Sequence, residues 1–321
     1  MTQPLKLVAI TGPTASGKTA LAVKLARRFN GEIISVDSRQ VFRGMNLGTG
    51  KDLEEYQEIP YHLIDVADPA EIYHLKRFMD DSAAALKTIN EHGSLPLLCG
   101  GTALYLDAVL RNYELKGGEP DFTRRAEIRD LPSTELAARL LKLAPELYGS
   151  LQSHELKNQE RLLRLLERAR NHEMATDNEL FDQYRKLVIG VYFTRSEIRK
   201  RIETRLDRRL AAGMIEEVAD LHEKCGVSWD RLEMFGLEYR AIAEYLQKKI
   251  SFDDMRSSLL NRIRQFAKRQ DIWFRKMERS GIVIHWIVNG NFEQSAALVD
   301  DFLHDRPLPE PEIRLDDIRY G

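Results

Sequence analysis

Short apolar runs alternate with amphipathic segments along the first hundred residues. We predict four buried strands in this region, at residues 7–10, 31–38, 61–65 and 95–102. Between the first two runs, Leu21 and Leu25 recur at helical spacing, and residues 73–93 predict a helix that ends at Gly93. The alternation of strands with helices predicts an α/β fold with a parallel sheet.

The pattern becomes mainly helical after Leu110. Residues 112–125 are polar and contain glycine and proline, which predicts a linker, and leucines at helical spacing within 133–170 predict a helical insertion. Strand-like runs return at 185–194 and 281–288. Long helices are expected at 196–223, 236–248 and 253–279. We therefore assign residues 1–112 and 186–290 to the core, 113–185 to the insertion, and 291–321 to a loosely held C-terminal tail.

The composition excludes several classes of protein. The chain has 321 residues, of which 43% are hydrophobic and 31% charged, as expected of a globular protein. We find no apolar run long enough to span a bilayer and no signal peptide. Cys99 and Cys225 provide neither a disulfide framework nor a metal cluster, so a cytoplasmic setting is expected.

Positive charge is concentrated in two predicted helices, although the net charge is only -2. Residues 195–209 contain seven Lys or Arg against three Asp or Glu, and residues 256–279 contain eight against two. Such local basic surface can bind a polyanion. Two solvated helix faces would account for the composition equally well.

The turn after the first strand matches the P-loop pattern at every fixed position. Its glycines let the backbone wrap an anion, and the following helix presents its positive N-terminus. Lys18 can reach outer phosphate oxygens, and the Thr19 hydroxyl can ligate Mg²⁺. The pattern does not say whether the phosphate belongs to ATP, GTP or another ligand. The predicted phosphate-binding residues are Gly12, Pro13, Thr14, Ala15, Ser16, Gly17, Lys18 and Thr19.

An aspartate, Asp37, ends the second predicted strand, which we place next to the P-loop strand. Because ligands bind beyond the carboxyl ends of strands in open α/β sheets, Asp37 and Lys18 should face one crevice. The Asp37 carboxylate has three interpretations: a metal ligand, a general base, or a cap of the turn with Ser38. The polar continuation of the chain after Asp37 favours substrate recognition over metal binding.

Several motifs together resemble the bacterial tRNA dimethylallyltransferase family. They are GPTASGKT (12–19), DSRQVFRGMNLGTGK (37–51), YHLIDVADP (61–69), GGTALY (100–105), RLLRLLE (161–167), the arginine-rich segment 195–218, MFGLEYR (234–240) and RQFAKRQDIWFRK (264–276). The resemblance covers nearly the whole chain up to about Val288. It implies a P-loop NTPase-like α/β core with a helical insertion and long C-terminal helices.

The resemblance also implies a reaction. The P-loop would hold the pyrophosphate of dimethylallyl diphosphate, and the dimethylallyl group would pass to the exocyclic N6 of the adenosine 3′ of the anticodon. Asp37 matches the family's catalytic base. Lys18, the loop amides, Mg²⁺ and an arginine, Arg201 or Arg205, would stabilise the leaving group, and Thr19 would contact metal and diphosphate.

The implied partners are dimethylallyl diphosphate and the anticodon stem-loop of tRNA, with no membrane, no obligate protein partner and a monomeric state. In the last basic helix we expect Trp273 in a core and leave Phe274 open. The residues implied to bind tRNA are Asp37, Ser38, Arg39, Gln40, Thr102, Glu160, Arg161, Arg164, Gly236, Arg240, Lys268, Arg269 and Gln270.

The chain departs from the family's usual wording outside the catalytic positions. Asp52 stands where a proline is usual, His74 replaces a serine, and Leu237 and Glu238 separate Gly236 from Tyr239. The segment Asn158-Gln159-Glu160 also lacks the usual aspartate and proline.

Three alternative functions were weighed against tRNA prenylation. A small-molecule kinase would use the same loop with ATP, but it leaves the two basic helices unexplained. An adenylate isopentenyltransferase would use a free nucleotide, against which the long basic C-terminal region argues. A non-enzymatic RNA-binding switch would not need an aspartate at the strand end.

Overall fold

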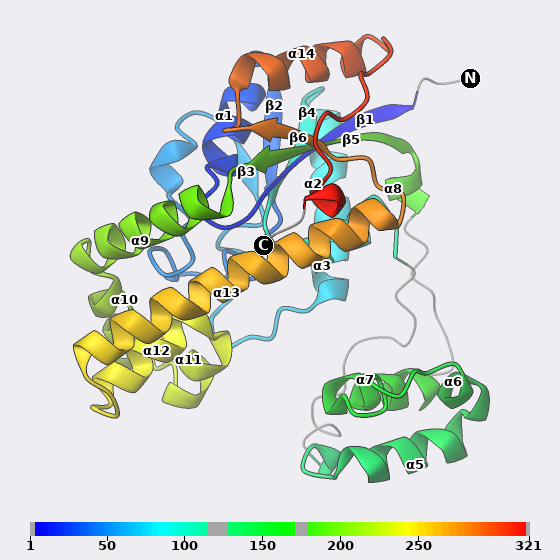
Figure 1. The fold of residues 1–321 in the computed structure, drawn as a ribbon. Coiled ribbons are helices and arrows are strands. Elements are labelled where there is room, and N and C mark those ends of the chain that lie inside the picture. The colour runs from blue at the N-terminus through cyan, green and yellow to red at the C-terminus, as the bar shows by residue number, and fades with distance from the viewer. Residues whose placement is uncertain (1–3, 114–126, 171–178, 319–321) are drawn as a thin grey trace. The chain divides into compact units, whose positions relative to one another are not determined.

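The structure, a computed structural model, describes residues 4–113, 127–170 and 179–318. The chain divides into two compact units, one formed by Met1–Arg111 with Leu180–Gly321 and the other by Asn112–Glu179 (Figure 1). The second unit overlaps the insertion expected at 113–185. It ends earlier, because the strand that starts at Tyr184 already pairs with the central strand of the first unit.

The first unit is built on a six-stranded parallel sheet, which confirms the predicted fold class. The strands are β1 (Leu5–Thr11), β2 (Gly31–Ser35), β3 (Tyr61–His62), β4 (Leu95–Gly100), β5 (Tyr184–Tyr192) and β6 (His285–Val288). Their order is β3-β2-β4-β1-β5-β6. Central β1 is paired on both edges, with Val8 opposite Leu97 of β4 and Leu187 of β5.

This order corrects the expected position of Asp37. The strand that precedes it, β2, is not adjacent to β1, because β4 lies between them. The chain leaves β1 through the P-loop helix to β2 and returns to the gap only after a further helix. Asp37 therefore lies two strands from the P-loop.

Helices cover both faces of the sheet, and each buries an apolar stripe. On one face, Leu25 of α1 (Lys18–Arg28) and Phe302 of α14 (Phe292–Leu303) belong to the same buried cluster as Ile10. Helix α2 (Leu75–Glu91) packs on α3 (Ala103–Leu110) and on β4. His74 caps α2 through Nδ1, which accepts the N–H of Arg77 at 3.2 Å. It therefore provides the N-terminal cap at the position where the family usually has a serine.

The C-terminal half is helical and differs from prediction in three places. Its helices are α9 (Arg195–Ala211), α10 (Met214–Glu223), α11 (Trp229–Phe235), α12 (Leu237–Leu246) and α13 (Phe252–Arg279). The single helix expected at 196–223 is two, because the chain turns at Gly213 with φ of 100°. Helix α11 was not expected. The expected tail, 291–321, begins with packed helix α14, and Leu315 beyond it is also buried.

The second unit is a small helical cluster. It contains α5 (Ser133–Leu143), α6 (Pro145–Gly149) and α7 (Gln159–Arg170), with Leu136 and Leu140 packed against Leu162 and Leu166. A short helix, α8 (Glu179–Asp182), leads back to β5. The expected linker lies outside the described residues from position 114 onward. Among the described helices of the chain, none is long and apolar enough to cross a membrane.

Candidate active site

A cavity of about 760 Å³ lies beyond the carboxyl ends of the central strands. The turns that follow β1, β2 and β4 form its floor, and α9, α12 and α13 contribute to its walls. Lys18 and Asp37 both line this cavity, as expected, although β4 separates their strands. The arrangement is that of an open α/β sheet, in which the ligand site lies at a change of strand order.

The P-loop is held in place by side chains from distant helices. Gln270 of α13 accepts the N–H of Thr14 at 2.8 Å and donates from Nε2 to the carbonyl of Gly101 at 2.8 Å. Arg201 of α9 donates from Nε to the carbonyl of Ala15 at 2.7 Å. The loop residues that line the cavity are Thr14, Ala15, Gly17, Lys18 and Thr19, whereas Gly12, Pro13 and Ser16 are buried beneath them.

Two cations of the cavity, Lys18 and Arg205, have lowered pKa values. Burial lowers the pKa of Lys18, and the charge of Arg205 lowers it further. Burial also lowers the pKa of Arg205 to about 10, and the neighbouring charge of Arg209 contributes. Arg209 forms an ion pair with Asp52 at 2.9 Å, but Arg205 forms no ion pair with any described residue. The site is therefore prepared for an anion of high charge.

The two candidate arginines differ in their surroundings. Arg201 is anchored to the P-loop carbonyl and lies 4.4 Å above the Phe193 ring. Arg205, one turn along α9, lines the cavity and keeps its whole guanidinium for a ligand. The geometry favours Arg205 as the group that contacts a diphosphate, with Arg201 shaping the loop.

Asp37 uses only one of its carboxylate oxygens within the protein. Oδ1 accepts the N–H of Arg39 at 2.9 Å and that of Gln40 at 3.4 Å, which closes the turn after β2. Thr102 supports the same turn by accepting the N–H of Ser38 at 3.0 Å. Oδ2 has no hydrogen-bond partner in the part of the chain that the structure describes. Asp37 thus caps the turn and still offers a free oxygen to the cavity.

The oxygen donors of the cavity suit a hard divalent cation. The Thr19 hydroxyl and the carboxylates of Asp37, Asp52, Glu55 and Glu238 all line it. No cluster of three acidic, histidine or cysteine side chains in the described ranges could hold a metal alone. This donor set fits Mg²⁺, which keeps several waters and is usually bound through one or two protein groups together with phosphate oxygens.

Two residues expected to contact tRNA have their amide groups engaged inside the protein. Gln40 accepts the Ser35 hydroxyl at 2.8 Å and donates to the carbonyl of Gly50 at 3.0 Å. Gln270 is only 4% exposed and bridges Thr14 and Gly101. Both glutamines also line the cavity, so their side chains hold its floor in place, and their contact with tRNA stays a prediction.

Other residues expected to contact tRNA lie in three places: in the cavity lining, on α12 outside that lining, and in the second unit. Gly236 and Arg39 line the cavity, and the Arg39 guanidinium lies 5.4 Å from the Phe235 ring centre. Arg240 is exposed and donates to the carbonyl of Glu233 at 2.9 Å, away from the residues that line the cavity. In the second unit, Arg161 pairs with Glu155, Arg164 pairs with Glu167, and Glu160 also lies on α7.

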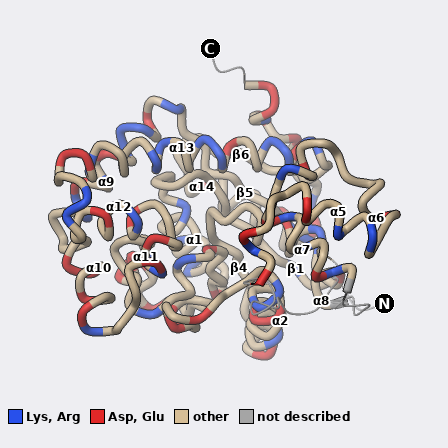
Figure 2. Tube along the Cα trace, turned by 90° about the horizontal axis from the view of Figure 1, so that it is seen from below, with Lys and Arg blue, Asp and Glu red and all other residues tan. Residues whose placement is uncertain are grey.

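Helix α13 presents a limited set of unpaired cations. Lys and Arg recur along α9 and α13 (Figure 2), but many face acidic partners. The paired arginines on α13 are Arg256, Arg262, Arg264 and Arg279. Lys268 and Arg269 are exposed and form no ion pair with a described residue, and Arg269 also lines the cavity. The basic surface that can meet a polyanion is thus smaller than the composition indicates.

Of the neighbouring aromatic residues Trp273 and Phe274 on α13, the structure buries Phe274 and not Trp273. Trp273, expected in a core, lines the cavity with the Lys276 ammonium 4.5 Å from its ring centre. Phe274 is 0% exposed and lies 5.5 Å from the Trp286 ring. The phase of the helix explains the correction, because Phe274 shares the buried stripe with Gln270 and Met277.

The structure adds acidic residues that sequence reasoning missed. Burial raises the pKa of Glu238 and that of Glu55, and in the case of Glu55 the nearby Asp52 charge contributes. Glu238 belongs to a departure from the family wording, which was the only sequence signal for it. Cys99 is buried and its pKa is raised to about 11 by burial, as expected of a small core residue.

Two family models match most of the chain. Residues 40–277 match the IPP transferase family, and residues 5–59 match isopentenyl transferases. The chain is 47% identical over 302 residues to tRNA dimethylallyltransferase 2 of Pelobacter propionicus, which covers 93% of this chain and 95% of that protein. It is 47% identical over 288 residues to tRNA dimethylallyltransferase of Treponema pallidum, covering 87% and 90%.

Solved structures agree as well. The full-length tRNA isopentenylpyrophosphate transferase of Bacillus halodurans is 32% identical, with a TM-score of 0.67 and coverage of 94% of this chain and 96% of that one. A eukaryotic dimethylallyltransferase acting on tRNA is 23% identical with a TM-score of 0.81, covers 95% of this chain and 81% of that one, and shares the fold. On these matches, the chain belongs to the IPP transferase family, together with the bacterial tRNA dimethylallyltransferases.

Proposed function

We propose that this chain transfers the dimethylallyl group from dimethylallyl diphosphate to the exocyclic N6 of the adenosine that follows the anticodon in tRNA. Pyrophosphate is released. The observation that carries the proposal is one cavity that holds a P-loop, an unpaired arginine and a carboxylate with a free oxygen. Its family membership supports the same reaction.

The reaction needs a base, because an aromatic amine is a weak nucleophile. Asp37 Oδ2 takes a proton from N6 as that nitrogen bonds to the allylic carbon and the bond from this carbon to the diphosphate oxygen breaks. Oδ1 stays bound to the amides of Arg39 and Gln40, so the carboxylate keeps its orientation during the transfer. The proton ends on Asp37 and the electron pair of the broken bond leaves with pyrophosphate.

The leaving group gains negative charge as the bond breaks. Lys18, Arg205 and P-loop residues line the cavity in which it forms, and burial leaves the charges of Lys18 and Arg205 little screened by water. The Thr19 hydroxyl would hold Mg²⁺ together with the diphosphate, and the ion would supply further charge neutralisation. Thr19 and Lys18 thus act on the donor, and Asp37 acts on the acceptor.

The acceptor is an RNA loop, and its target base must leave the stack to enter the cavity. Lys268 and Arg269, exposed and unpaired within the described chain, suit contacts to phosphates of the anticodon stem. Arg39, Thr102 and Gly236 suit the acceptor nucleotide, and the α7 residues Glu160, Arg161 and Arg164 are proposed as further tRNA contacts. We propose that one copy of the chain suffices for this.

Labelled dimethylallyl diphosphate tests the proposal directly. The protein is incubated with Mg²⁺ and, in separate reactions, with unmodified tRNA whose anticodon loop carries consecutive adenosines, with AMP, and with ATP. Label in tRNA is expected. Label in AMP but not in tRNA would indicate an adenylate isopentenyltransferase, and ATP turnover without prenyl transfer would indicate a kinase.

A further inference from the structure

The loop between β2 and β3 has its own network of polar contacts, separate from that of the P-loop. We call residues 42–52 the acceptor-side loop. Four of its residues, Gly48, Thr49, Gly50 and Asp52, line the cavity. Gln40 ties the loop to the strand end that carries Asp37, because its Nε2 donates to the carbonyl of Gly50 at 3.0 Å. The loop therefore walls the cavity on the side of the base.

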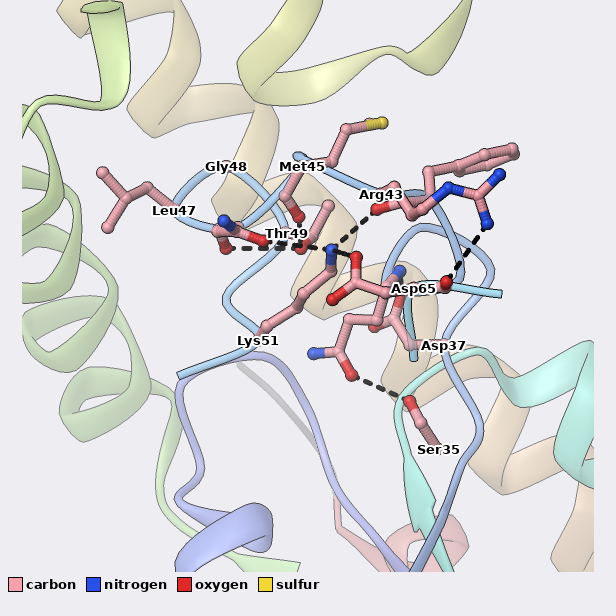
Figure 3. A network of polar contacts seen from close by, with 12 residues as sticks. Ser35, Asp37, Arg43, Met45, Leu47, Gly48, Thr49, Lys51 and Asp65 are labelled. Carbon is pink, nitrogen blue, oxygen red and sulfur yellow. Dashed lines mark hydrogen bonds and ion pairs between the residues drawn. The ribbon is translucent and has the colours of Figure 1, made fainter. Parts of the chain in front are cut away.

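A buried lysine closes the loop on itself. Lys51 is 1% exposed, and its Nζ donates to the carbonyl of Phe42 at 2.6 Å and to Asn46 Oδ1 at 3.1 Å. It also forms an ion pair with Asp65 (Figure 3). The Thr49 hydroxyl adds a bond to the carbonyl of Met45 at 2.5 Å. These contacts fix the shape of the loop but not its place against the helices.

A carboxylate from α10 fixes that place. Glu217 accepts three consecutive backbone N–H groups, those of Asn46 at 2.9 Å, Leu47 at 2.6 Å and Gly48 at 3.1 Å. The Tyr239 hydroxyl donates to the same carboxylate at 2.8 Å. A Cβ on Gly48 would lie 2.6 Å from a carbon of the Tyr239 ring, so loop and ring are in direct contact. Tyr239 lines the cavity as well.

Resting on the proposed function, we infer that Glu217 is a positioning residue for the acceptor. It does not line the cavity, but it holds two parts that do, the acceptor-side loop and Tyr239. Together they form a wall of fixed shape beside Asp37, against which the acceptor adenosine lies. Bonds from amides to a carboxylate are stronger than neutral ones, and without Glu217 three neighbouring amides would lose their partner.

The inference predicts different effects on the two substrates when Glu217 is lost. Loss of a residue with only a structural role would impair the use of both. The P-loop is held by Gln270 and Arg201, and neither residue contacts Glu217 or the acceptor-side loop in the described structure. Loss of Glu217 should therefore disturb the tRNA side and leave the diphosphate side intact.

The test is Glu217→Gln, measured in steady-state transfer to tRNA. The glutamine turns an NH₂ group toward backbone donors and keeps one acceptor oxygen in place of two. We expect kcat/KM for tRNA to fall about tenfold to a hundredfold, while the Kd for dimethylallyl diphosphate changes less than about twofold. Tyr239→Phe, which removes only the bond to Glu217, should give a smaller loss of the same kind and serves if Glu217→Gln does not fold.

Glu216→Gln is the matched control, because Glu216 is the exposed neighbour on α10 and forms no hydrogen bond or ion pair through its side chain with a described residue. It should leave both constants unchanged. The inference is overturned if the wild type transfers to tRNA but Glu217→Gln or Tyr239→Phe impairs kcat/KM for tRNA and the Kd for dimethylallyl diphosphate equally, or changes neither. Absence of transfer by wild type would instead overturn the proposed function, and the inference with it.

Discussion

At the scale of single residues, Asp37 combines hydrogen bonds that close a turn with its proposed role as the general base. Because Oδ1 caps the turn and Oδ2 is free among the described contacts, substitutions can separate the two roles. Asp37→Asn keeps an oxygen for the amides of Arg39 and Gln40 but cannot take a proton. The two roles predict different effects on rate and on binding.

We expect Asp37→Asn to lower kcat about a hundredfold to ten-thousandfold, the usual contribution of a general base. The Kd for dimethylallyl diphosphate should stay within about twofold, because the base acts in the transition state. Single-turnover transfer and equilibrium binding of the donor measure the two quantities. A variant that transfers at the wild-type rate would show that Asp37 is not the base.

The lowered pKa values of Lys18 and Arg205 predict a pH dependence of donor capture. Both groups bind the diphosphate when protonated, and burial lowers both pKa values, that of Arg205 to about 10. The kcat/KM for dimethylallyl diphosphate should therefore fall as the pH rises toward about 10, earlier than for ordinary lysine and arginine.

Arg205→Gln should remove the Arg205 part of this decline and lower kcat/KM for the donor about tenfold to a hundredfold at neutral pH. Circular dichroism at each pH controls for unfolding. A profile that stays flat up to about pH 10 in the wild type would contradict the assignment of these cations to the donor.

At the scale of elements, the cations of α13 differ in whether they form ion pairs within the protein. Four of its arginines are paired with acidic side chains, whereas Lys268 and Arg269 are free of ion pairs with described residues. Lys276 is likewise exposed without an ion pair to a described residue, and these cations have charge to exchange for the counterions of RNA. Charge counts along the sequence cannot make this distinction.

Lys268→Ala and Arg269→Ala should each reduce the slope of log K for tRNA against log salt by about 1, and weaken binding at low salt. Arg262→Ala is the control, because Arg262 pairs with Glu244 at 3.5 Å. Binding titrations at several salt concentrations measure the slope. Equal slopes in all three variants would exclude this part of α13 from the RNA surface.

The elements also show what the sequence could predict. The strands and the parallel sheet followed from apolar runs, and the P-loop and Asp37 followed from motifs. The position of β4 between β1 and β2 did not, because strand order depends on pairings between segments about sixty residues apart. The core position expected for Trp273 was wrong because neighbouring aromatic residues of a helix differ only in helix phase. Gln270 was expected at the site, but its buried contacts and those of Glu217 could not be predicted, because a polar residue gives the same sequence signal whether it faces water or backbone.

At the scale of the whole molecule, the cavity and a buried polar cluster that stabilises the fold lie at opposite ends of the strands. The carboxyl ends of the strands carry the cavity, and Glu32 lies near the opposite end of β2. It is 4% exposed and bonds to His62 Nε2 and His92 Nδ1, each at 2.8 Å. Burial raises the pKa of Glu32, but hydrogen bonds from His62, His92 and Ser94 lower it more, so the net shift is downward.

A folded-state pKa below the unfolded value means that Glu32 stabilises the fold above the unfolded pKa. This contribution is lost as the pH falls through the folded pKa. Glu32→Gln should therefore lower the free energy of unfolding by about 1–3 kcal/mol at neutral pH and by less in acid.

Thermal unfolding midpoints measured from neutral to acid pH show the effect. The rate of prenyl transfer by Glu32→Gln should stay near that of the wild type. Glu58→Gln, which removes an exposed pair with Arg27, is the control and should change the midpoint little. An equal loss at neutral and acid pH would show that the Glu32 carboxylate charge is not what stabilises β2.

The place of Gln270 has a consequence for how the two substrates influence each other. It directly follows Lys268 and Arg269 in sequence, yet it is buried, where it joins the amide of Thr14 to the carbonyl of Gly101. One turn of a continuous helix thus carries proposed RNA contacts on its outside and holds the P-loop from its inside. A change that RNA made in this turn would reach the P-loop through Gln270 and the cavity through Arg269. By thermodynamic reciprocity, whatever the nucleic acid does to the affinity for the diphosphate, the diphosphate does in equal measure to the affinity for the nucleic acid.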